Sequence, residues 1–197
     1  SAILYFNEKE EVISFMEELL VNTGAWTATS VKDRAALLDH NGAGKVENGI
    51  TIPGPELQAF YKEARELGLV GMPLPREYGG LHVPAALQFV VMSQLSRSCM
   101  GSATQMAFFT SIAEMVHRFC DKETAERIIP QIINCDLSGS MNLTEPGCGS
   151  DLGMIKTTAT RLDNGKFSIN GSKIFITNGG GGVSFVLAKI KGAPEGL

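Results

Sequence analysis

The chain lacks the signals of a metal protein, a disulfide scaffold, a nucleic-acid binder and a membrane protein. Its four cysteines include no C-x-x-C pair, and its three histidines have no metal-ligand spacing. We therefore predict reduced thiols, no metal site and a reducing compartment, the cytoplasm or the mitochondrial matrix. The net charge of −4 disfavours nucleic acid and anionic membranes as partners. No apolar run approaches the roughly 20 residues of a membrane span.

The first two thirds of the chain read as helical. The 197 residues, 44% of them hydrophobic, suit a globular protein of one large domain or two small ones. Apolar residues recur at helical spacing over 7–21, 85–96 and 102–119, and Pro55 is placed to open another helix. A short helix is expected over 31–39, with loop around it. Asp121 suits the N-cap of a last helix, which Pro130 should interrupt and kink.

The hydrophobic period changes from 3.6 to 2 near residue 138. Alternation over 155–162 and 166–170, joined by Asp163-Asn164-Gly165, predicts a β-hairpin. Two more strands are expected over 173–177 and 183–190. We thus predict an α+β protein: an all-α helical bundle over 1–137, then an incomplete antiparallel β-barrel or sandwich over 138–197.

The loop between these halves, residues 141–151, concentrates polar chemistry. It holds Thr144, Ser150 and Asp151, and the glycines at 147 and 149 let backbone N–H groups approach a flat or anionic ligand. On local chemistry alone a plain turn explains it equally well. A dinucleotide-binding loop does not, because alternating residues rather than a helix follow.

Two segments of this loop resemble the flavin-contacting loop of the acyl-CoA dehydrogenase family. They are Leu143-Thr144-Glu145 and Cys148-Gly149-Ser150-Asp151, which match its pattern of apolar residue, Ser/Thr, Glu, then small residue, Gly, Ser/Thr and Asp. About 65 residues upstream, the run over 66–80 resembles another stretch of that family. It carries Leu67-Gly68-Leu69 and, further on, Tyr78-Gly79-Gly80.

The resemblance implies a fold and an activity. Family members enclose FAD and an acyl-CoA thioester between an N-terminal helical domain, a middle β domain and a C-terminal four-helix domain. Residues 138–197 would be the middle domain cut about halfway, with the C-terminal domain absent. The family removes an α proton from the thioester while a hydride leaves the β carbon for flavin N5, giving the 2,3-enoyl-CoA. Its base is a Glu of the C-terminal domain, so no catalytic residue is assigned here.

The resemblance also assigns cofactor-binding residues by motif position. They are Met141, Leu143, Thr144, Gly149 and Ser150 in the first loop, and Phe175, Ile176 and Thr177 in a second segment. Thr144 would bond the pyrimidine side of the flavin and Thr177 would reach N5. Ser150 would also contact the CoA moiety of the substrate.

Phe175 departs from the family, in which most members carry Trp there. Phe can still stack on the isoalloxazine, with less area and no N–H donor. The change suggests the long subgroup related to 3-methylmercaptopropionyl-CoA dehydrogenase, which often shows Lys-Ile-Phe-Ile (173–176 here), Leu-Thr-Glu-Pro (143–146) and Ala-Pro-Glu-Gly (193–196). Glu145 and Asp151 could form an acid/base dyad, but a role in holding the loop is favoured.

The resemblance further implies an electron-transfer flavoprotein as electron acceptor and a homodimer or homotetramer. Without the C-terminal domain, we expect the chain to bind FAD weakly or not at all and to turn over nothing. An acyl-CoA oxidase, a flavin monooxygenase or a non-catalytic DNA-binding homologue on the same scaffold remain alternatives. The acidic balance counts against the last.

Overall fold

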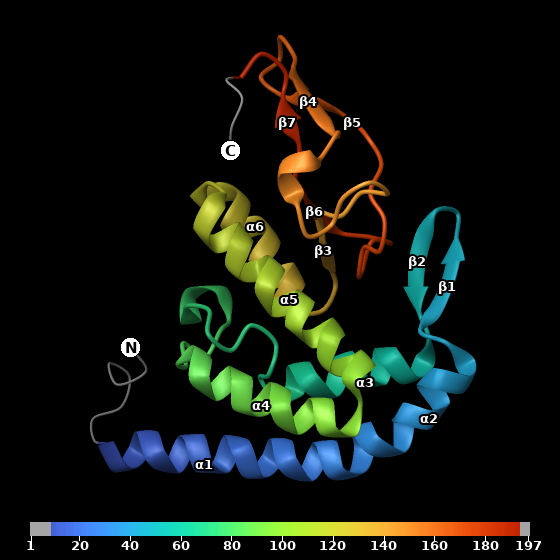
Figure 1. The fold of residues 1–197 in the computed structure, drawn as a ribbon. Coiled ribbons are helices and arrows are strands. Elements are labelled where there is room, and N and C mark those ends of the chain that lie inside the picture. Colours follow the sequence, from blue (N-terminus) through green and yellow to red (C-terminus); the bar gives the residue numbers. More distant parts are fainter. Residues whose placement is uncertain (1–8, 194–197) are drawn as a thin grey trace. The chain divides into compact units, whose positions relative to one another are not determined.

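The chain forms two compact units, which divide after Ser138 and are described separately. The structure is a computed structural model that describes residues 9–193, with the backbone alone at Ile50 (Figure 1). Residues 7 and 8 of the first predicted helix and residues 194–196 of the Ala-Pro-Glu-Gly segment lie outside it. The α+β prediction is confirmed, since helices fill the first unit and short sheets the second.

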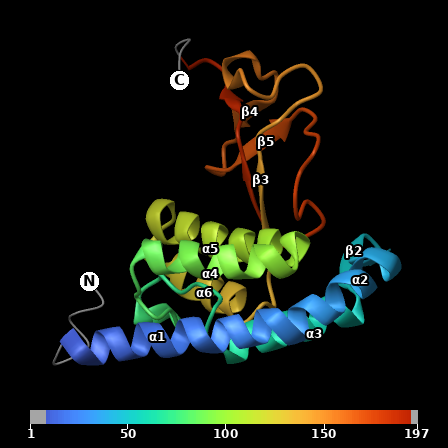
Figure 2. The same cartoon turned by 60° about the horizontal axis from the view of Figure 1, so that its bottom comes forward.

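The first unit is a stack of helices, as predicted. Its α-helices are α1 (Lys9–Trp26), α2 (Lys32–Asn41), α3 (Pro55–Glu66), α4 (Ala85–Ser98), α5 (Met100–Phe119) and α6 (Lys122–Ile133). Along the stack, α1 packs on α4, α4 on α5 and α5 on α6. Figure 2 shows α1 running along one side of the stack. No helix within residues 9–193 has both the length and the apolar character needed to cross a bilayer.

The predicted helix ends are mostly correct. Asp121 caps α6, accepting a hydrogen bond from the Thr124 amide at 2.8 Å. Pro55 opens α3 at the first helical position, where its missing N–H costs nothing. The predicted interruption at Pro130 is wrong, because α6 continues through it to Ile133.

The loop after α3 belongs to the core of this unit. Met72 and Leu74 are fully buried there. The carbonyl of Met72 accepts hydrogen bonds from the amides of Leu81 and Val83. A Cβ at Gly80 would lie 2.1 Å from the carbonyl oxygen of Leu74, so only glycine fits. The close approach of backbone explains the glycine at 80, and a φ of +93° explains the glycine at 79.

The hairpin of β1 (Gly44–Glu47) and β2 (Ile50–Pro53) was not predicted, since this region was expected to be loop. It projects from the junction of α2 and α3 (Figure 1). Its turn is Asn48-Gly49, with φ of 51° and 76°, the left-handed pair that suits a two-residue hairpin. The flanking strands are only four residues long, too short for alternation to be recognised.

The second unit contains two small sheets and no closed barrel among its described residues. Its strands are β3 (Gly139–Asn142), β4 (Thr158–Arg161), β5 (Phe167–Asn170), β6 (Val183–Val186) and β7 (Lys189–Ile190). The hairpin predicted at Asp163-Asn164-Gly165 is confirmed, with β4 antiparallel to β5. The prediction of a purely antiparallel region is wrong, because β3 pairs parallel with β6 and β4 parallel with β7. Parallel strands need a long connection between them, and both of these pairs have one.

Two strand predictions fail in detail. Residues 183–190 form two strands, β6 and β7, rather than one. Residues 173–177 form no strand. This segment alternates in sequence like a strand, but its polar contacts go to a loop instead of a neighbouring ladder.

Glu63 on α3 ties together the junction of α1 and α2. Its carboxylate accepts hydrogen bonds from Trp26 Nε1 (2.7 Å), Ser30 Oγ (2.8 Å) and both terminal nitrogens of Arg34. Arg34 above all, helped by Trp26 and Ser30, lowers the pKa of Glu63 to about 2. The three donors follow one another at intervals of four residues. Because an α-helix has about 3.6 residues per turn, side chains at this interval do not lie directly above one another. The wider π-helical turn Thr27–Val31 between the helices brings the three side chains closer to one line, on the side that faces Glu63.

We predict that Glu63→Ala lowers the free energy of unfolding by about 2 kcal/mol, because Trp26 and Arg34 lose their acceptor. Fluorescence of Trp26, the single tryptophan, follows the unfolding of this unit. The control is Glu66→Ala on the same helix, whose exposed Lys62 pair is 3.9 Å long. It should change stability by no more than about 0.5 kcal/mol.

The effect of Glu63 should depend on pH. Its pKa is lowered from 4.5 to about 2, so its stabilisation is complete above about pH 4.5 and is lost as the pH falls through 2. The stability difference between wild type and Glu63→Ala should therefore close over that range. A difference that stays constant from pH 5 to pH 2 would contradict this role.

Candidate functional site

The first predicted site segment, residues 141–151, begins on a strand and ends on a capped turn. Met141 lies on β3 opposite Phe185 of β6. Glu145 and Cys148 exchange backbone hydrogen bonds of 2.8 and 3.1 Å, which closes a tight turn. Asp151 then accepts a hydrogen bond from the Gly153 amide at 3.1 Å and caps the short 3-10 helix Leu152–Met154.

Glu145 is the anchor of this loop. Its side chain is only 6% exposed and accepts hydrogen bonds from the amides of Lys156 (2.7 Å) and Thr157 (2.9 Å) and from Lys173 Nζ (2.9 Å). The Thr157 side chain first, then the Lys156 amide and the Lys173 ammonium, lower the pKa of Glu145 to about 2. Such a carboxylate is a poor proton acceptor near neutral pH. The hydrogen bonds of Glu145 and Asp151 agree with the favoured role of these two residues in holding the loop.

Lys173 and Ile174, which directly precede the second predicted segment, 175–178, lie against the first segment. The Ile174 amide donates to the Thr144 carbonyl at 2.9 Å, and Lys173 Nζ donates to the Leu143 carbonyl at 2.9 Å. With the bond from Lys173 to Glu145, three hydrogen bonds join two segments about 30 residues apart in sequence. The structure thus brings together the two stretches that the motifs singled out separately.

The predicted cofactor residues differ in exposure. Met141, Leu143, Thr144, Ile176 and Thr177 are half-buried, whereas Gly149, Ser150 and Phe175 are exposed. Phe175 is 89% exposed and has φ of +56°, the left-handed region that a bulky residue rarely adopts. A side chain at Gly147 would meet nothing within 4 Å, so the loop is open there to an incoming group.

Each segment carries a side-chain amide atom that is buried without a hydrogen-bond partner in the described structure. These atoms are Asn142 Oδ1, an acceptor, and Asn178 Nδ2, a donor. Buried polar groups without partners are uncommon in folded proteins. One acceptor and one donor are therefore available here to a polar ligand.

Sequence reasoning missed the role of Lys173. It was placed on a predicted strand with no partner named, and its side chain is only 9% exposed. Its partner, Glu145, lies 28 residues earlier. No local pattern relates residues at that separation; only the presence of a lone Lys in an apolar run hinted at a buried partner.

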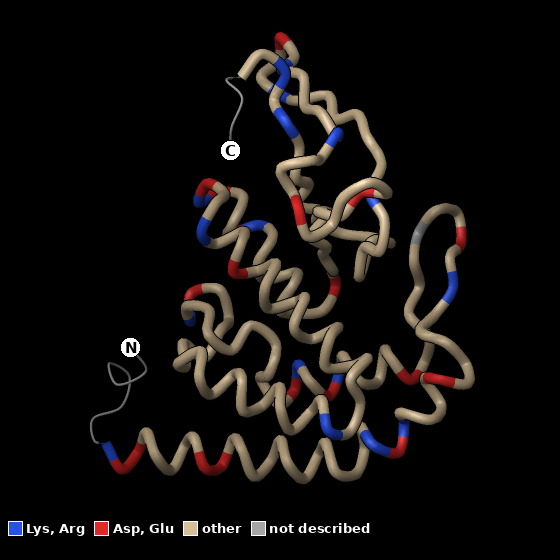
Figure 3. The backbone as a smooth tube through the Cα atoms, in the orientation of Figure 1, with Lys and Arg blue, Asp and Glu red and all other residues tan. Residues whose placement is uncertain are grey.

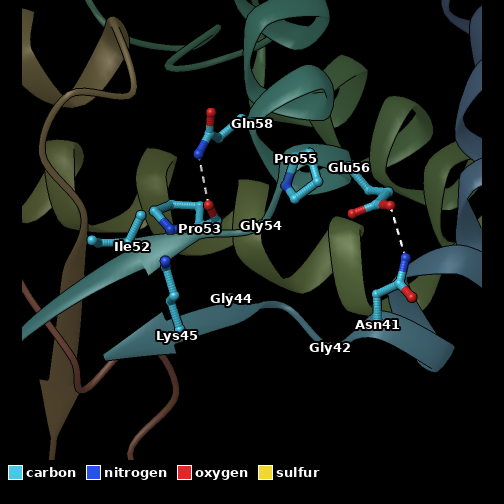
Figure 4. A pocket seen from close by; sticks show the side chains of 10 residues that line it. All are labelled: Asn41, Gly42, Gly44, Lys45, Ile52, Pro53, Gly54, Pro55, Glu56 and Gln58. Carbon is cyan, nitrogen blue, oxygen red and sulfur yellow. Dashed lines mark hydrogen bonds between the residues drawn. The ribbon is translucent and has the colours of Figure 1, made fainter. Parts of the chain in front are cut away.

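A separate cavity of about 580 Å³ lies in the helical unit, between the end of α2, the base of the β1–β2 hairpin and the start of α3 (Figure 4). Asn41 Nδ2 bonds Glu56 Oε1 at 2.9 Å there, and Gln58 Nε2 bonds the Pro53 carbonyl at 2.7 Å. The cavity contains none of the predicted site residues. Within residues 9–193, no three His, Cys, Asp or Glu side chains are grouped as metal ligands.

The chain belongs to the acyl-CoA dehydrogenase family. The family described as "Acyl-CoA dehydrogenase, N-terminal domain" matches residues 17–136, and "Acyl-CoA dehydrogenase, middle domain" matches residues 140–196. The family resemblance read from the sequence is therefore confirmed.

Individual relatives agree with this membership. An acyl-CoA dehydrogenase of Bacillus subtilis is 33% identical over 136 residues, 68% of this chain and 36% of that protein. The 3-methylmercaptopropionyl-CoA dehydrogenase of Ruegeria pomeroyi is 29% identical over 88% of this chain and 30% of that protein. The crystal structure of an acyl-CoA dehydrogenase complexed with FAD from Bacillus anthracis is 27% identical, with a TM-score of 0.75, over 91% of this chain and 29% of that one. The chain thus spans about a third of the length of these relatives.

Proposed function

We propose that this chain supplies the flavin-contacting face of an FAD-dependent acyl-CoA dehydrogenase. The reaction would oxidise an acyl-CoA thioester to the 2,3-enoyl-CoA. The main support for the proposal is that three hydrogen bonds join residues 143–145 to residues 173–174. Two motifs expected to line one cofactor are useful only if they lie together.

The residues present fit a flavin. Its pyrimidine edge carries both hydrogen-bond donors and acceptors, which complement the unpartnered Asn142 Oδ1 and Asn178 Nδ2. The exposed ring of Phe175 offers an aromatic face for stacking on a planar ring system. The open backbone at Gly147 leaves room for close approach.

Each residue would have a limited role. The hydroxyls of Thr144 and Thr177 would donate hydrogen bonds that orient the ring, and Phe175 would cover it from water. Ser150, exposed on the same loop, would contact the CoA moiety of the substrate. When bound, FAD supplies the hydride acceptor for the β carbon. The general base that takes the α proton is assigned to none of the described residues, because in the family it is a Glu of the C-terminal domain.

The remaining parts of the proposal are the domains, the partners and the compartment. We place a domain boundary at 137/138, supported by the division into units after Ser138 and by the gap between the two family matches. An electron-transfer flavoprotein would accept the electrons, and the protein would act as a homodimer or homotetramer. The four free cysteines suit a reducing compartment, the cytoplasm or the mitochondrial matrix.

We predict that the complete natural protein carries a flavin whose oxidised visible band is bleached anaerobically by an acyl-CoA thioester. A panel of thioesters of different chain length and substituent identifies the substrate class in the same experiment. Reduction accompanied by oxygen uptake in air would favour an oxidase or monooxygenase on this fold. Absence of flavin would contradict the proposal. Salt-dependent binding to DNA would then favour the DNA-binding alternative. The distribution of charge disfavours that alternative, because Lys and Arg are scattered along the described chain (Figure 3).

We predict that Phe175→Ala weakens FAD binding about tenfold without changing stability. The ring is 89% exposed, so its removal costs no packing, whereas a lost stacking contact costs on the order of 1 kcal/mol. FAD affinity is measured by absorbance titration of the flavin-free protein, and stability by hydrogen exchange at the amides of the second unit. Phe119→Ala, 74% exposed on the helical unit, is the matched control and should leave both unchanged. Equal FAD affinity in the two variants would contradict a role for Phe175.

A further inference from the structure

The segment that carries the second motif has no strand partner. It lies between β5, which ends at Asn170, and β6, which begins at Val183, and residues 171–177 are in neither sheet. The Ile174 amide bond to Thr144 and the side chain of Lys173 attach it to the first loop. Its position therefore depends on few contacts.

Lys173 contributes more of these contacts than any other side chain on the segment. Its ammonium donates to the Leu143 carbonyl and to Glu145 Oε1, each at 2.9 Å, and the side chain is 9% exposed. An ammonium that leaves water needs such acceptors. Both acceptors belong to the first loop. Lys173 can therefore be buried only when its segment lies against that loop.

The groups proposed to meet the cofactor follow Lys173 closely. Phe175 is two residues later and Thr177 four residues later. Phe175 is 89% exposed and has a left-handed φ, so packing of its ring does not hold it in place. The backbone fixed at Lys173 and Ile174 determines where the ring lies.

We propose that Lys173 is a positioning residue for the flavin, whose buried ammonium sets the spacing between the Thr144 loop and the segment 175–177. The inference rests on the proposed function. Lys173 itself touches no cofactor; it acts through the loops that it joins. Glu145 is its counter-charge and connects the same point to the start of β4 through the amides of Lys156 and Thr157.

Two variants separate positioning from mere structural support. Lys173→Met keeps the side-chain stem, removes the ammonium and leaves Glu145 buried without its counter-ion. The double variant Lys173→Met/Glu145→Gln removes both charges, and the single side-chain carbonyl that it introduces can still accept from the Lys156 amide, which bonds Glu145 Oε2, but not from the Thr157 amide as well. Neither variant can restore the bond to the Leu143 carbonyl. The double variant should therefore recover folding but not the spacing of the loops.

The experiment measures two quantities on the complete natural protein. The first is FAD affinity, with the absorbance spectrum of the bound flavin. The second is hydrogen exchange at the Lys156 amide, which reports whether the fold around residue 145 is intact. Lys173→Met should weaken FAD binding by about tenfold or more, shift the flavin spectrum and speed the exchange. The double variant should restore the slow exchange while FAD binding stays weak. Exposed Lys166→Met, on the neighbouring hairpin, should match wild type in both.

Several results would overturn the inference. A double variant that regains both slow exchange and tight FAD binding would give Lys173 a structural role only. Variants that bind FAD with wild-type affinity and spectrum would refute the positioning role while leaving the proposed function intact. A double variant that does not fold would also contradict it, because positioning requires the two effects to be separable. Failure of the wild-type protein to bind FAD would instead refute the proposed function.

Discussion

A carboxylate that leaves water must find partners inside the protein, and Glu145 finds them on two stretches of chain, at residues 156–157 and at Lys173. Its own turn closes through Cys148, its oxygens hold the amides at the start of β4, and its charge is balanced by Lys173. The sheets of this unit are short, with two- and four-residue strands. The buried ion pair therefore orders a region that strand pairing alone would leave loosely defined.

The helical unit uses a carboxylate in the same way. Glu63 accepts hydrogen bonds from Trp26, Ser30 and Arg34, which precede it by 29 to 37 residues in sequence. These bonds hold the π-helical turn between α1 and α2. The difference is in exposure: Glu63 remains partly open to solvent, whereas Glu145 and Lys173 are nearly closed off. Removing one partner of the closed pair leaves a charge that water cannot reach, which makes the loop junction the more sensitive of the two.

Features governed by local sequence were predictable, and those set by distant contacts were not. The start of α3 at Pro55, the cap at Asp121 and the hairpin at 163–165 follow from the preferences of single residues or short motifs. The β1–β2 hairpin was missed because four-residue strands show too little alternation. The parallel pairings join residues as far apart as Gly139 and Val183, and residues 173–177 are held by the bond from Lys173 to Glu145, 28 residues away. For the site, motif resemblance located both segments, but the atoms that join them came only from the structure.

We propose that residues 141–151 and 175–178 form one cofactor-binding surface. This proposal is tested most directly by hydrogen exchange along the complete natural protein with and without saturating FAD. The account predicts that FAD slows exchange in both segments together, while the β1–β2 hairpin beside the separate cavity is unaffected. Bound FAD that protects neither segment, or that protects the residues around that cavity instead, would contradict it.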